Sequence, residues 1–178
     1  MSAPPYPRVV AAPQMPLAEV LARSSAQMSV PRAMQGLSAA QPLQLHEFEL
    51  GHPALGFRLE PGRFTLLKLV GATVVGIRVS PQLDYLDPHG AVALLGRCAA
   101  VLRAATWEPD GSFSGEQARV NATLAGEALA GAWRTPQWRA QMRLRRVHAA
   151  GDPLPRMLGI SHDLFLVTLS FMGEADGI

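Results

Sequence analysis

A run of arginines is the part of the sequence best suited to binding. Five arginines and no acidic residue lie between residues 128 and 151: Arg134, Arg139, Arg143, Arg145 and Arg146. This stretch carries +5, and the other eleven basic and all fourteen acidic residues leave −3 elsewhere. A guanidinium presents planar donors that suit carboxylates or phosphates. We therefore take Arg139, Arg143, Arg145 and the nearby Trp133 as a candidate site for an acidic protein surface.

The arginines alternate with apolar residues, the period of a half-buried strand. From residue 138 to 148 the apolar positions are Trp138, Ala140, Met142 and Leu144. The arginines must then face the other way. A second interpretation remains open, in which they form only a solvated outer face that also discourages edge-to-edge pairing of strands.

The histidines are the candidate residues for metal binding or base catalysis. His46-Glu47 begins a zinc-protease pattern, but position 50 is Leu. His46, Glu49 and His52 could still converge on a metal or remain solvated polar groups, and we expect no metal and no cofactor. His162 precedes an acid, a pair that could orient an imidazole for base catalysis or could simply form a turn.

Common catalytic and nucleotide-binding signatures are missing. There is no phosphate loop and no Gly-x-Gly-x-x-Gly motif, and Phe113 occupies the serine position of a hydrolase elbow. The single cysteine, Cys98, falls on an apolar helical stripe and is expected in the core. We therefore expect a non-catalytic interaction or accessory module. The alternative is a small hydrolase-like enzyme whose site assembles from distant residues such as His46, His52 and His162.

Composition limits the class of protein. An apolar fraction of 48% and a charged fraction of 17% predict a folded, soluble chain. Arginine almost replaces lysine, which suggests a bacterial source. The net charge of +2 makes nucleic acid an unlikely partner. We expect no membrane-spanning segment, and the cytoplasm is favoured over a periplasmic location with the signal removed.

Two helices and several strands should position these residues. Asp87-Pro88 is an N-cap pair for a helix, and Ser114 with Gln117 forms a capping box for a second, which should end near Gly126 or Gly131. Strands are predicted at Leu43 to Leu50, Leu55 to Leu59, Thr73 to Val79, Trp138 to His148 and Phe165 to Phe171, the last two paired antiparallel. Residues 64–70 fit a helix or a strand, and we favour a strand.

This order of elements predicts an α+β fold. An antiparallel or mixed sheet of about four to six strands should carry two main helices on one face. Residues 1–42 are rich in proline and alanine and read as an N-terminal arm with a short docking helix after Pro16. Residues 43–178 should form the single domain.

Overall fold

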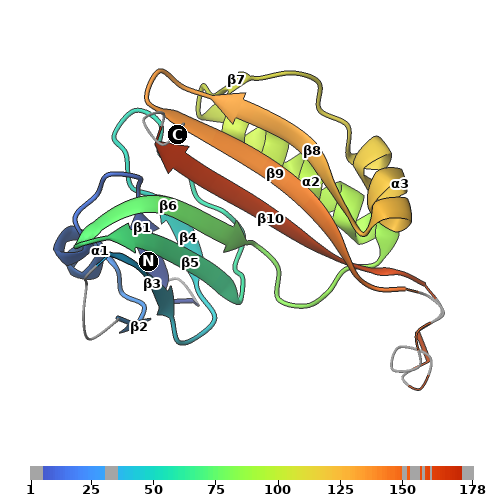
Figure 1. The fold of residues 1–178 in the computed structure, drawn as a ribbon, viewed down its shortest axis with the longest axis horizontal. Helices are drawn as coiled ribbons and strands as arrows, with labels where there is room; N and C mark the ends of the chain where they lie inside the picture. Colours follow the sequence, from blue (N-terminus) through green and yellow to red (C-terminus); the bar gives the residue numbers. More distant parts are fainter. Residues whose placement is uncertain are drawn as a thin grey trace, which may run out of the picture.

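The computed structural model describes residues 6–30, 36–149, 152, 157, 159–160 and 162–173. Within these residues eight strands form one main sheet in the order β2-β3-β5-β6-β10-β9-β8-β7 (Figure 1). Every neighbouring pair is antiparallel. The strands are β2 (Met28–Ser29), β3 (Leu37–Pro42), β5 (Phe64–Val70), β6 (Thr73–Ser80), β7 (Glu108–Pro109), β8 (Glu127–Arg134), β9 (Trp138–His148) and β10 (Leu164–Gly173).

The pair β9–β10 is the longest in the sheet, and its antiparallel pairing confirms the prediction. On β9, apolar side chains at alternate positions are buried and the arginines between them are exposed. On β10 the buried set is Phe165, Val167, Leu169 and Phe171. The period of two therefore gives the sheet one buried face and one face turned outward.

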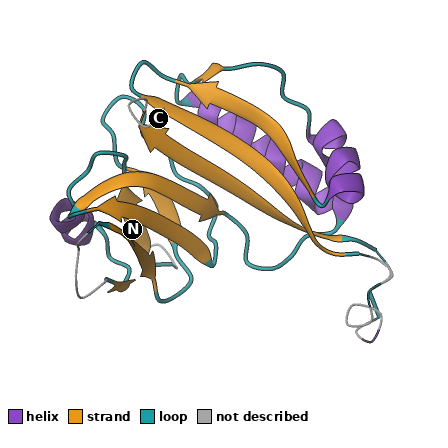
Figure 2. Cartoon of the chain, in the orientation of Figure 1, coloured by secondary structure: helices purple, strands orange, loops and turns teal. Residues whose placement is uncertain are grey.

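Two helices cover part of the buried face, as predicted. They are α2 (Pro88–Ala104) and α3 (Gly115–Ala125), which lie behind β8, β9 and β10 in Figures 1 and 2. The Asp87 side chain accepts a hydrogen bond from Gly90 N at 2.6 Å, and Ser114 Oγ accepts one from Gln117 N at 3.2 Å. Gly126 ends α3 with φ of 86°, a left-handed conformation that glycine adopts without strain. None of the described helices is long and apolar enough to cross a membrane.

A smaller layer covers the rest of the buried face. It contains β1 (Arg8–Ala11), which pairs in parallel with β4 (Glu47–Leu50), and α1 (Leu17–Arg23). The Phe48 ring stacks on Phe171 of β10, with centroids 6.1 Å apart and an interplanar angle of 10°. Phe171 also meets Trp107, which follows α2, at 5.8 Å. Both layers therefore share one core on the same side of the main sheet.

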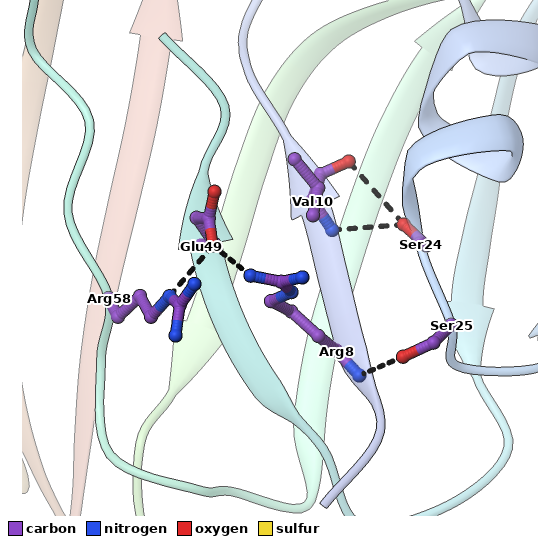
Figure 3. Close-up of polar contacts among 6 residues, drawn as sticks. All are labelled: Arg8, Val10, Ser24, Ser25, Glu49 and Arg58. Carbon is purple, nitrogen blue, oxygen red and sulfur yellow. Dashed lines mark hydrogen bonds and ion pairs between the residues drawn. The ribbon is translucent and has the colours of Figure 1, made fainter. Parts of the chain in front are cut away.

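Glu49 ties the small layer together. Its Oε2 accepts hydrogen bonds from Arg8 Nη1 at 2.7 Å and from Arg58 Nε at 2.8 Å (Figure 3). Burial alone would raise the pKa of the Glu49 carboxyl, but the two guanidiniums outweigh it and lower the pKa below its ordinary value. Ser24 Oγ accepts from Val10 N at 2.9 Å, so α1 is also held to β1.

The N-terminal segment differs from the expected arm. Its described residues, 6–30 and 36–42, form β2 and β3 of the main sheet and also β1 and α1 of the smaller layer. The side chains of Val9, Leu17 and Val20 are buried. The expected boundary after residue 42 falls at the end of β3, which is paired with β5. Pro13 lies in the turn after β1 and Pro16 is the N-cap of α1. Prolines at such short intervals also occur in extended linkers, which is why the composition predicted an arm.

The α+β class is confirmed, but the main sheet of the described residues has eight strands rather than four to six. The helix α1 is the short helix predicted after Pro16, in addition to the two main ones. Residues 64–70 form the favoured strand. The strand predicted at Leu55 to Leu59 is wrong. This segment makes only an isolated bridge from Arg58 to Glu49. Strand β8 was missed because Ala and Gly, which are weak strand formers, supply four of its eight residues.

Candidate binding face

The outward side of the main sheet is the candidate site, because no described helix lies on it (Figure 2). Arg139, Arg143 and Arg145 project from this side of β9 and are exposed, as the alternation requires. The register places them opposite β10 residues of the same side: Arg143 faces Thr168, and Arg145 faces Leu166. The three predicted arginines therefore lie together on one surface.

The fold adds two cations that sequence reasoning did not include. Lys68 of β5 and Arg78 of β6 point outward from the other side of β10. Together with the three arginines they form what we call the basic face: Lys68, Arg78, Arg139, Arg143 and Arg145. The alternation in residues 64–70 could have indicated that Lys68 lies opposite the buried residues, once this segment was taken as a strand. Only the strand order reveals that β5 and β6 lie beside β10 and β9.

The basic face borders an open hollow of about 520 Å³. Its floor is β10, which contributes uncharged side chains to the lining: Leu166, Thr168, Ser170 and Met172. Cations stand on both flanks, Lys68 and Arg78 on one and Arg143 and Arg145 on the other. The hollow is therefore a shallow channel with a neutral floor and basic sides.

The charges of this surface are largely uncompensated. Glu127 is the single carboxylate among the lining residues, and its Oε1 lies 3.4 Å from Arg143 Nη1. Within the described part of the chain, no ion pair joins Lys68, Arg78, Arg139 or Arg145 to an acid. Exposed cations that lie within a Debye length of one another, about 10 Å, create a positive local potential.

Trp133 does not belong to this face. Its side chain is 1% exposed and packs against Phe113, with ring centroids 5.7 Å apart. Its neighbours on β8, Ala132 and Arg134, point the other way, so Trp133 lies on the core side of the sheet. The strand period could have revealed this placement, but sequence reasoning did not identify β8.

A second, smaller hollow adjoins the first. It measures about 210 Å³ and shares Phe64 and Leu166 with the larger one. Leu83 and Tyr85, in the segment before α2, line it and are 37% and 51% exposed. Apolar surface of this kind adjoining exposed cations offers a partner both an anchor point and charge contacts.

The histidines have other surroundings. His46 is buried, and its Nδ1 and Nε2 lie 2.8 Å from Gln44 O and 2.7 Å from Thr65 Oγ1. Burial lowers the pKa of His46, which favours the neutral ring. In the neutral form Nδ1–H donates to the carbonyl, so Nε2 accepts from the Thr65 hydroxyl. Both ring nitrogens are thus hydrogen-bonded, Nδ1 within the segment before β4 and Nε2 across to β5.

His52 and His162 are not gathered with His46 into a site. His52 Nδ1 accepts hydrogen bonds from Ala54 N and Leu55 N, at 3.3 and 3.1 Å. The His52 and Trp138 rings are nearly perpendicular, with centroids 4.9 Å apart. His162 is exposed and lies two residues before β10. Across the described ranges, no group of three or more His, Cys, Asp or Glu side chains is placed to hold a metal ion.

Cys98 is buried in α2, as its position on the apolar stripe predicted. Burial raises the pKa of the Cys98 thiol to about 12. A thiol of this kind is almost wholly protonated near neutral pH, whereas a nucleophilic cysteine needs the thiolate. The residue therefore serves packing between α2 and the sheet.

No protein-family model, no curated protein and no solved structure matches this chain. The function must therefore be inferred from the basic face and its hollow.

Proposed function

We propose that this protein is a non-catalytic interaction module that binds the acidic surface of a protein partner through its basic face. The observation that carries the proposal is the concentration of four exposed cations around one open hollow, with a single carboxylate among the lining residues. Arg139 adds a fifth exposed cation on the same side of β9. The net charge of the whole chain is only +2, so the positive potential is local to this face.

The type of charge supports a protein partner. Arginine donates in a fork that matches a carboxylate, and four of the five cations are arginines. Nucleic acid is the weaker interpretation because bases stack on aromatic side chains, and Phe64 is the one aromatic among the residues lining the larger hollow.

The enzyme alternative has less support. Its three candidate histidines occupy separate places, and His46 has both ring nitrogens in hydrogen bonds within the protein. A general base needs a free nitrogen within reach of substrate. The module is therefore the function that the geometry favours.

The test compares two charge-reversed proteins of equal net charge. In the face variant, Arg139 and Arg143 become Glu. In the control variant, Arg103 and Arg119 become Glu, because both lie on the helices of the opposite layer. Exposed ion pairs contribute at most about 1 kcal/mol each, so both variants should melt close to the wild type.

Each protein is then used for affinity capture from the source organism at low salt, and captured proteins are titrated in purified form. We expect an acidic protein that the wild type and the control retain and the face variant loses, mainly through a slower association rate. Equal capture and equal affinity for all three proteins would show that the basic face is only a solvated surface.

A further inference from the structure

The two hollows restrict the shape of an occupant. The backbone N–H and C=O groups of the floor already have hydrogen-bond partners, because β10 is paired with β6 on one side and with β9 on the other. An extended segment lying on this floor could not join the ladder, and its own N–H and C=O groups would stay unpaired on the side facing the sheet. A helix satisfies its backbone internally and does not have this difficulty.

The dimensions agree with a helix. Strands β5 and β9 are three strand spacings apart, or about 14 Å at roughly 4.8 Å per spacing. A helix with its side chains is about 10–12 Å across. Along the floor, Leu166 to Met172 spans about 20 Å at roughly 3.3 Å per residue, which equals the length of about 13 helical residues.

The chemistry of the lining specifies the faces of that helix. The uncharged β10 side chains would meet small or apolar residues. The cations on the two flanks would meet carboxylates on both borders of this stripe. At one end, Phe64 and Leu166 open into the smaller hollow, where Leu83 and Tyr85 could receive one large apolar side chain.

We infer that the occupant of the basic face is an amphipathic acidic helix of the partner protein, whose apolar stripe is bordered on both sides by carboxylates and ends in a bulky apolar residue. This inference rests on the proposed function and deepens it by naming the form of the partner. Charge disfavours a symmetric contact between two copies of this chain through their basic faces, since two basic faces would repel.

Three synthetic peptides of one composition test the inference. The first places Leu and Ala along one helical stripe, Glu on both borders and Phe at one end. The second scrambles this order. The third keeps the order but carries a central proline, which breaks a helix. The other two peptides carry that proline at the C-terminus instead, so that all three have the same composition. Binding to the full-length protein is followed by fluorescence anisotropy at low salt.

We expect the first peptide to bind at least about tenfold more tightly than the other two, and the variant with Arg143 and Arg145 changed to Glu to lose about tenfold of that affinity. Phe64→Ser should weaken the first peptide through loss of the anchor. The control with Arg103 and Arg119 changed to Glu should bind like the wild type. Equal affinity for the ordered and scrambled peptides overturns the inference.

A fluorescent label locates the peptide. Cys98 is buried, so a label attaches selectively to Ser170→Cys in the floor or to Ser112→Cys in an exposed loop. Emission from the floor label should shift when the first peptide binds, whereas the loop label should not respond. A shift at the loop label alone places the peptide elsewhere and rejects the site.

The remaining outcomes separate the two proposals. If the proline-broken peptide binds as well as the first, and binding still needs the basic face, the acidic partner stands and the helix is rejected. A single-stranded oligonucleotide that binds more tightly than every peptide rejects both proposals. Self-association of the unliganded protein in sedimentation, abolished by the face variant, replaces the helix with a second copy.

Discussion

Thr65 Oγ1 donates a hydrogen bond to His46 Nε2 at 2.7 Å inside the core, and this contact links the segment before β4 to strand β5. The pKa of His46 is lowered in the folded protein from its ordinary value of 6.5 because the ring is buried. Just below pH 6.5, His46 therefore becomes protonated in the unfolded chain while it stays neutral in the folded protein. The stability contributed by a neutral His46 is complete above that pH and is lost as the pH falls.

This predicts that the free energy of unfolding decreases as the pH falls from 7 toward 5, and that His46→Gln flattens the decrease. Urea titrations at a series of pH values measure both. Thr65→Val should cost about 1–3 kcal/mol at pH 7, because the buried ring nitrogen loses its donor. The histidine has no such role if His46→Gln keeps the wild-type pH dependence.

A second prediction concerns the N-terminal segment. Leu17 and Leu21 both lie on α1, but the Leu17 side chain is 2% exposed and that of Leu21 is 42% exposed. Leu17→Ala should therefore lower the free energy of unfolding by about 2–5 kcal/mol. Leu21→Ala is the matched control and should change it by less than about 0.5 kcal/mol. Equal, small effects in denaturant titrations would restore the interpretation of this segment as an arm outside the core.

A third prediction concerns Glu49 and its two arginines. Glu49→Gln keeps the shape of the side chain and removes the charge, and should lower stability by about 1 kcal/mol because both contacts are partly exposed. The effect should fade as the pH falls below the ordinary value of 4.5, since the wild-type carboxyl then also becomes protonated. Glu47→Gln, on the same strand, is the control. A cost for Glu49→Gln that stays constant down to pH 3 would contradict the electrostatic origin.

A fourth prediction concerns Cys98. The thiol is 3% exposed and its pKa is about 12, so a thiol reagent should label the native protein very slowly at pH 8. Labelling should become complete within minutes once denaturant unfolds the chain. The measurement is the absorbance of the released chromophore with and without denaturant. Rapid reaction of the native protein would mean that α2 opens or that the thiol has a chemical role.

The parts of the fold that the sequence predicted depend on short-range patterns. Asp87 with Pro88, and Ser114 with Gln117, start the two main helices within four residues of the cap, so their signals are local. The alternation in β9 and β10 likewise follows from the strand period, and it gave the outward direction of Arg139, Arg143 and Arg145.

Tertiary structure decided the rest, because it depends on which strands become neighbours. The short strands before residue 42 carry too few residues for a periodic signal, and this segment is held by packing on β5 and β6, whereas α1 was predicted from the residues after Pro16. Pairing of β8 with β9 turned Trp133 into the core, and pairing of β10 with β6 brought Lys68 and Arg78 beside the arginines. Sequence alone determined the direction of each side chain along its own strand; strand order, set by non-local pairing, determined which side chains share a surface.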